Sequence, residues 1–171
     1  MQIENDPFWK LRPPPPTPND EICACASVTP VLLQPHLSPN PLSCARCNLE
    51  APPERIGFDE AVADELAYWG QLHNSFYFLW LDSGDFEEWA KMHLSDPLSV
   101  VNSLGLELAS KISKFCRCYL WWFQDEGADD WVPATMCPRC AGTLDVRFKG
   151  ERPQGGTLLV CEHCSVALAG Y

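Results

Sequence analysis

The sequence predicts an α+β protein: a small helical core with a tryptophan-rich strand, flanked by an N-terminal zinc-clamped element and a C-terminal zinc ribbon. Three observations lead to this fold class. Pairs of cysteines stand near both ends of the chain, apolar residues recur at helical spacing in its middle, and a run of strand-forming residues follows them. The predicted segments are a proline-rich disordered arm (1–20), a four-cysteine zinc-binding element (21–56), an acidic helical core with a strand (57–136) and a C-terminal zinc ribbon (137–171).

The N-terminal arm is defined by proline. Residues 1–56 hold 12 of the 16 prolines, including an uninterrupted run at 13–16. Because proline fixes φ and lacks a backbone donor, we expect residues 1–20 to be polyproline-like or disordered. Such an arm serves either as a plain tether or as a ligand for a domain that binds PxxP-type segments.

The helical core begins after Asp59, which is a good N-cap residue. A first helix is expected to run to about residue 81, and a short second helix should follow the break at 82–84. Inward positions of the second helix are predicted at Phe86, Trp89 and either His93 or Leu94. The apolar stripe of the first helix consists of Val62, Leu66, Trp69, Leu72, Phe76 and Leu79.

A third helix is predicted to open at Asp96 and Pro97, since this pair suits the N-cap and N1 positions. The segment 116–123 is rich in strand formers and predicts a buried or half-buried strand. The predicted inward face of the third helix consists of Leu98, Val101, Leu104, Leu108, Ile112 and Phe115.

The C-terminal cysteines have the spacing of a zinc ribbon. Two C-x2-C pairs are separated by twenty residues, a length that suits a hairpin with a turn region at 150–156. Zinc takes four ligands in a tetrahedron, and four thiolates leave no position for a reactive water, so a structural ion is predicted. The predicted ligands are Cys137, Cys140, Cys161 and Cys164.

A second zinc site is predicted from a C-x-C pair followed by a C-x2-C pair: Cys23, Cys25, Cys44 and Cys47. An alternative ligand set replaces Cys23 or Cys25 by His36. Two structural zinc ions are therefore expected. Cys116 and Cys118 remain outside both sets, and we expect them to be buried thiols because free cysteine is among the most buried residue types.

Negative charge is concentrated on the predicted helical core. The net charge is −11, and residues 57–136 contribute −10 of it, against −2 from 1–56 and +1 from 137–171. This balance argues against a general polyanion binder, because phosphate affinity comes from clustered Lys and Arg. The acidic surface is either a solvated helix face or a site for a basic protein partner, for which Asp85, Glu87 and Glu88 are the candidate residues.

No catalytic set is apparent. The sequence contains no H-E-x-x-H, G-x-S-x-G or P-loop motif, and its four histidines are not arranged with a nucleophile. We therefore expect a non-enzymatic, zinc-stabilised interaction module that regulates or neutralises a protein partner, as immunity proteins and antitoxins do. A nucleic-acid-binding zinc ribbon is the alternative, and a metal-dependent enzyme is third. Candidate nucleic-acid contacts are Arg147, Phe148, Lys149 and Arg152.

The N-terminus lacks the basic and apolar regions of a secretory signal, and no apolar stretch approaches the length of a membrane span. With cysteines spaced for metal ligation, these features favour a cytoplasmic protein without a membrane partner.

The central segments resemble a known group of proteins. They are residues 77–82 (YFLWLD), 96–102 (DPLSVVN) and 119–122 (YLWW), followed by the C-terminal cysteine pairs. Over roughly residues 57–165 they resemble uncharacterised bacterial zinc-ribbon-containing proteins that are described as candidate nucleic-acid binders. The resemblance implies a bacterial source and metal ligands at the four C-terminal cysteines. The N-terminal cysteine pairs depart from this pattern.

Overall fold

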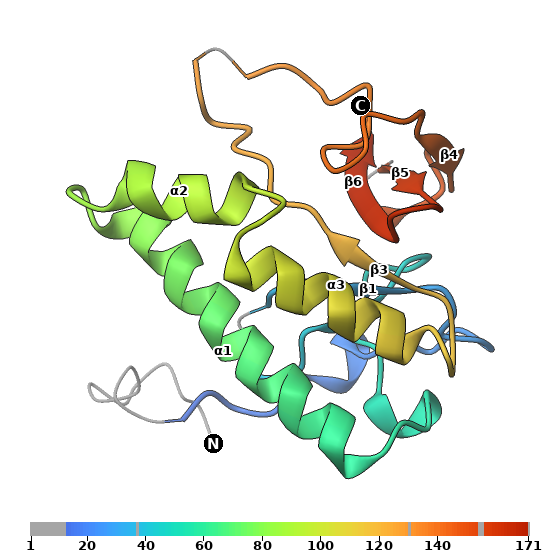
Figure 1. Cartoon of the computed structure of the whole chain (residues 1–171). Helices are drawn as coiled ribbons and strands as arrows, with labels where there is room; N and C mark the ends of the chain where they lie inside the picture. Colours follow the sequence, from blue (N-terminus) through green and yellow to red (C-terminus); the bar gives the residue numbers. More distant parts are fainter. Residues whose placement is uncertain (1–12, 37, 130, 154–155, 171) are drawn as a thin grey trace.

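We analysed a computed structural model, which describes residues 13–36, 38–129, 131–153 and 156–170. The α+β class is confirmed: three helices pack together beside a six-stranded mixed sheet (Figure 1). The α-helices are α1 (Glu60–Asp82), α2 (Glu87–Ser95) and α3 (Val100–Ile112), and short 3-10 turns lie at η3 (Asn19–Glu21) and η4 (Pro53–Arg55). The strands are β1 (Val31–Leu33), β2 (Leu42–Cys44), β3 (Cys118–Trp121), β4 (Asp145–Arg147), β5 (Thr157–Cys161) and β6 (Val166–Gly170).

The sheet joins segments from the whole described chain in the order β2-β1-β3-β6-β5-β4. The predicted tryptophan-rich strand is β3, and it pairs in parallel with β1 on one side and with β6 on the other. The outer pairs, β1 with β2 and β5 with both β4 and β6, are antiparallel. The N-terminal cysteine element and the C-terminal ribbon are therefore two flanks of one sheet, with β3 between them.

Side chains alternate between two buried faces of this sheet, as the period of two in a strand requires. On β3, Cys118 and Leu120 face the helices and belong to the main core, whereas Tyr119 faces the opposite side. On that opposite side a smaller cluster forms around Leu32, Leu158, Val160 and Ala167, all of them buried. Burial on both faces agrees with the near-continuous apolar character of the central strand.

The first helix lies where the sequence predicts it. Asp59 is its N-cap, and its carboxylate accepts a hydrogen bond from the Val62 N–H at 3.0 Å. The short second helix also forms, but two of its predicted inward side chains are exposed: Phe86 is 56% and Trp89 is 46% exposed. Phe86 precedes the helix as its N-cap, so the helical period does not apply to it. Ala90 and Leu94 are the residues of α2 that are buried.

The predicted start of α3 is wrong by three residues. Ser99 is the N-cap and accepts from the Asn102 N–H at 3.3 Å, whereas Asp96 is the C-cap of α2. The shift explains why Leu98 lies outside the helix and is exposed. Phe115 is also exposed, because α3 ends at Ile112, before it. Within the helix the predicted face holds, since Val101, Leu108 and Ile112 are buried and Leu104 is half-buried.

The part of the predicted arm that lies within the described residues is attached to the fold. Thr17 donates a hydrogen bond to the Glu50 carboxylate at 2.5 Å, and η3 leads directly into the first cysteine pair. The rest of the predicted arm, residues 1–12, lies outside the described residues. Within the described ranges, none of the helices combines the length and the apolar character that crossing a bilayer requires.

Candidate metal centres

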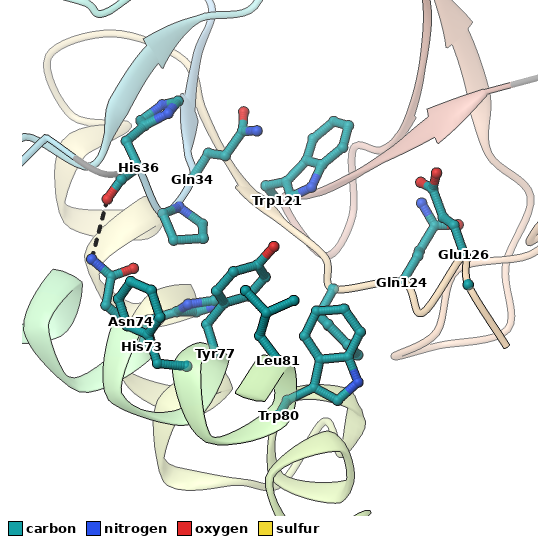
Figure 2. Close-up of a pocket in the computed structure, with 14 residues that line it drawn as sticks. Gln34, His36, His73, Asn74, Tyr77, Trp80, Leu81, Trp121, Gln124 and Glu126 are labelled. Atoms are coloured by element: carbon teal, nitrogen blue, oxygen red, sulfur yellow. Dashed lines mark hydrogen bonds between the residues drawn. The ribbon is translucent and has the colours of Figure 1, made fainter. Parts of the chain in front are cut away.

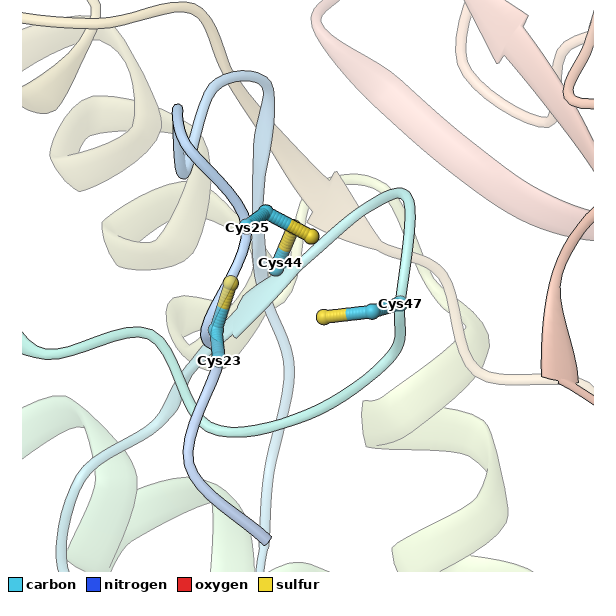
Figure 3. A group of neighbouring side chains, drawn as sticks. All are labelled: Cys23, Cys25, Cys44 and Cys47. Carbon is cyan, nitrogen blue, oxygen red and sulfur yellow. The ribbon is translucent and has the colours of Figure 1, made fainter. Parts of the chain in front are cut away.

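The structure brings the eight predicted ligands together in two groups. The Sγ atoms of Cys23, Cys25, Cys44 and Cys47 lie within 4.8 Å of one another, and the same holds for Cys137, Cys140, Cys161 and Cys164. Figure 3 shows the four sulfurs of the first group converging on a common point. We call the two groups the N-terminal and the C-terminal tetrad. Each is close enough to hold a metal ion.

Three of the four cysteine pairs share one backbone geometry. In each C-x2-C segment the residue after the second cysteine has a positive φ, at 58°, 55° and 54°. This left-handed residue turns the chain back, so the residue before the first cysteine pairs in antiparallel fashion with the residue seven positions later. These residue pairs are Ser43 with Glu50, Met136 with Thr143, and Val160 with Ala167. Each C-x2-C segment is thus the tip of a hairpin that directs two sulfurs toward one ion.

Backbone N–H groups also point at the sulfurs. The Gly142 N–H hydrogen-bonds the Cys140 thiol and, as the largest influence, lowers its pKa to about 7. A Cβ at Gly142 would lie only 3.2 Å from the Cys140 sulfur, so glycine permits this close approach. The Leu49 N–H makes the corresponding bond to Cys47, although burial raises the pKa of that thiol overall. Such donors stabilise thiolate sulfur, which is the form that binds metal.

The C-x-C pair is held by different means. The Cys23 N–H donates to the Glu50 carbonyl at 2.8 Å, which attaches the pair to the second hairpin arm of its own tetrad. The Arg55 guanidinium donates to the carbonyls of Cys23 at 2.8 Å and of Cys25 at 2.5 Å. Glu50 in turn accepts side-chain hydrogen bonds from Thr17, Ser38 and Asn40. Arg55 and Glu50 therefore position the two cysteines, and sequence spacing contains no signal for either.

Arg152 lies at the N-terminal tetrad, although it belongs to the turn of the C-terminal ribbon. It is 8% exposed, donates to the Asn48 side chain at 2.5 Å, and its guanidinium lies 5.8 Å from the Trp121 ring centroid. Burial lowers the pKa of Arg152, and the nearby thiols of Cys44 and Cys47 oppose this shift. A permanently charged guanidinium beside two thiolates offsets their charge.

The other candidate nucleic-acid contacts do not form a free basic cluster. Arg147 pairs with Glu162 at 3.1 Å and with Asp145 at 3.9 Å. Phe148 is half-buried beneath Arg46, whose guanidinium lies 5.2 Å from the ring centroid. Lys149 is exposed. With Arg152 turned inward, the four residues do not present one surface.

The remaining candidate ligands lie elsewhere. His36 is not part of the N-terminal tetrad, which consists of four cysteines. Cys118 is fully buried on β3, and burial raises its pKa, while Cys116 is half-buried just before the strand. Neither belongs to a metal-ligating group among the described residues.

The candidate partner-binding residues Asp85, Glu87 and Glu88 lie at the turn from α1 into α2. Three of the four cations of segment 57–136 are used elsewhere: Lys91 pairs with Asp125 at 2.6 Å, Lys111 with Glu65 at 2.6 Å and Arg117 with Glu162 at 2.7 Å. No ion pair joins the three turn carboxylates to a described cation. Their charge is therefore not neutralised within the described fold.

Comparison with known proteins adds no relative: no protein-family model, no curated protein and no solved structure matches this chain. The fold and its two tetrads therefore define the class of molecule as an α+β protein with two candidate structural metal centres. The resemblance to bacterial zinc-ribbon proteins stays a prediction.

Proposed function

We propose that this chain is a zinc-stabilised, non-enzymatic interaction module. In this proposal each tetrad holds one structural zinc ion, and the turn between α1 and α2 binds a basic segment of a protein partner, which it regulates or neutralises. The observation that carries the proposal is the combination of exposed aromatic side chains with carboxylates that no described cation pairs with at this turn.

Zinc is supported by ligand type and by geometry. Four thiolates suit a tetrahedral d¹⁰ ion and give a closed site without a position for substrate. In a zinc tetrahedron with bonds of about 2.3 Å, two sulfurs lie about 3.8 Å apart. The Sγ atoms of Cys140 and Cys161 are 3.7 Å apart. A closed site of this kind supports a structural role for the metal.

The α1–α2 corner has the composition of a binding surface; it is defined here as Asp82, Asp85, Phe86, Glu87, Glu88 and Trp89. Phe86 and Trp89 are half exposed, and aromatic residues are enriched where one protein binds another. The Trp89 ring is held in place by His93, at 4.5 Å between centroids, and by Phe76, at 5.4 Å. A ring that is fixed before binding loses little conformational entropy when a partner covers it.

The chemistry of the corner selects the partner. Apolar rings beside carboxylates are complementary to a segment that presents an aliphatic or aromatic side chain flanked by Lys or Arg. An Arg guanidinium can both stack on Trp89 and pair with a neighbouring carboxylate. The surrounding negative charge also accelerates encounter with a basic partner and repels nucleic acid.

The test is affinity purification of the tagged, metal-loaded full chain from its host lysate, with and without nuclease. We expect a stoichiometric protein that survives nuclease and is released by salt. Glu88→Lys and Trp89→Ala should each remove it, because the first reverses a charge and the second deletes the aromatic anchor.

Asp64→Lys is the matched control, since it reverses one exposed carboxylate near the other end of α1. The proposal fails if the control removes the companion protein as completely as Glu88→Lys does. It also fails if the companion consists of nucleic acid and disappears with Arg147→Ala and Lys149→Ala, which is the result that the nucleic-acid alternative predicts.

A further inference from the structure

A cavity of about 670 Å³ lies between the C-terminal half of α1, the chain leaving β1 and the chain leaving β3 (Figure 2). Its walls are largely aromatic, and they include the rings of Tyr77, Trp80, Trp121 and Phe123. Its volume is in the range of cavities that hold small molecules and cofactors. Neither tetrad contributes a residue to it.

Buried polar atoms without a protein partner gather in the walls of this cavity. They are His73 Nδ1, His36 Nε2, and both amide atoms of Gln124. Four of the six such atoms among the described residues therefore belong to residues that line one cavity. His73 is only 3% exposed. Buried polar groups are nearly always hydrogen-bonded, to protein, ordered water or ligand, so the unpartnered ones around this cavity are groups that a polar ligand could satisfy.

The charge of the walls limits the ligand. Among the residues that the structure describes, no lysine or arginine lines the cavity, and Glu126 is the one charged side chain apart from the histidines. Burial lowers the pKa of His73 to about 4 and also lowers that of His36, so both imidazoles are neutral at pH 7. A phosphate or carboxylate would therefore find no counter-charge among the described lining residues. A neutral imidazole and a carboxamide each offer both a donor and an acceptor.

We propose that this cavity binds an uncharged heteroaromatic molecule of the nucleobase or nucleoside class. The aromatic walls provide stacking surfaces for a planar ring, as in other base-binding sites. Glutamine amides pair with adjacent donor and acceptor atoms on a base edge, and the Gln124 amide at the cavity has no protein partner. Gln34 also lines the cavity, but its side-chain oxygen already accepts from the Ser43 hydroxyl at 3.2 Å. The proposal is independent of partner binding at the α1–α2 corner.

The experiment is isothermal titration calorimetry of the metal-loaded full chain with the four common ribonucleosides and their free bases. Nucleoside monophosphates and short single-stranded oligonucleotides form two further arms. We expect saturable binding of at least one nucleoside or base, and binding weaker by about tenfold or more for its monophosphate, which brings charge without a partner. An oligonucleotide that binds more tightly than its nucleoside would overturn the assignment to a free nucleoside.

Gln124→Leu is the decisive variant because it should raise the stability of the free protein and lower its affinity for the nucleoside. It removes buried polar atoms that have no protein partner, so the melting temperature of the free protein should rise. The affinity for the nucleoside should fall about tenfold, the effect of one lost hydrogen bond. His73→Phe tests the polar group that α1 contributes to the cavity, and it replaces one aromatic ring by another of similar size.

Gln71→Leu is the matched control, because Gln71 is exposed on α1 and does not line the cavity. It should leave nucleoside affinity unchanged, and so should Trp89→Ala at the α1–α2 corner. The proposal is overturned if no nucleoside or base binds at millimolar concentration. It is equally overturned if Gln124→Leu and His73→Phe bind the panel as tightly as the parent protein.

Discussion

Two glycines within helices should respond to the same substitution with opposite signs. Gly70 lies in α1 and Gly105 in α3, and both are buried. A Cβ at Gly70 would meet Pro41 at 3.7 Å, which is ordinary van der Waals contact. A Cβ at Gly105 would lie 2.8 Å from Leu120 Cδ1 and 2.9 Å from Trp69 Nε1. The space available therefore differs, while the chemical change is identical.

The expected free energies follow from these contacts. Alanine is favoured over glycine inside a helix by about 1 kcal/mol, so Gly70→Ala should stabilise the protein by up to about that amount. At Gly105 the same gain is opposed by overpacking, which costs roughly 1–3 kcal/mol. Displacing Trp69 also weakens the hydrogen bond from its indole N–H to the Val101 carbonyl, 2.9 Å, worth about 1 kcal/mol. We expect Gly105→Ala to destabilise by about 1–3 kcal/mol.

The assay is thermal unfolding of both variants and the parent with metal in excess, followed by circular dichroism. In a chain of this size each kcal/mol shifts the melting temperature by about 2–4 °C. Gly70→Ala should raise the melting temperature and Gly105→Ala should lower it. A rise in both variants would show that α3 does not pack this closely against β3 and α1, and would refute the reasoning.

Two further predictions concern the metal centres and Glu50. A strong chelator should unfold the sheet, because structural zinc contributes on the order of 10 kcal/mol to folding. Cys44→Ser should unfold it without chelator, whereas Cys116→Ser should not. A sheet signal in circular dichroism that survives chelation would contradict this prediction. Burial raises the pKa of Glu50, but hydrogen bonds from Thr17, Ser38 and Asn40 outweigh it, so its pKa lies below the ordinary 4.5. Its stabilising effect is therefore present above about pH 4.5 and disappears as the pH falls through the lowered value. In urea unfolding, Glu50→Gln should lower stability at pH 7 but not in strong acid, whereas the exposed Glu54→Gln should change neither; equal losses at both pH values would contradict the assignment.

Local patterns predicted the local structure well. Asp59 capped its helix, and the two cysteine tetrads formed, because N-caps and C-x2-C turns depend on a few adjacent residues. The start of α3 was mispredicted because two suitable caps stand three residues apart. Asp96 and Ser99 are both good N-caps, and the choice depends on tertiary contacts such as Asn102, which donates to the Leu94 and Asp96 carbonyls.

The non-local features could not be predicted from spacing. β3 pairs in parallel with both β1 and β6, and each pairing joins distant parts of the sequence. Leu32 pairs with Tyr119, 87 positions away, and Leu120 pairs with Val166, 46 positions away. Strands of three to five residues leave almost no periodic signal. The position of Arg152, a residue of the C-terminal ribbon, at the N-terminal tetrad is a consequence of this pairing. The cavity is another consequence, because its walls come from three separate segments.

The single sheet links the metal centres to the cavity. β1 lies in the sequence between the two cysteine pairs of the N-terminal tetrad, and residues 34–36, which follow it, form one cavity wall. β3 pairs with β1 and with β6, which follows the last cysteine pair, and residues 121–127 form the opposite wall. Because these strands of three to five residues are too short to persist alone, both walls depend on the hairpins that the tetrads close. Metal bound at either tetrad therefore stabilises the cavity from a distance, so metal loss should abolish ligand binding even though no cysteine touches the ligand site.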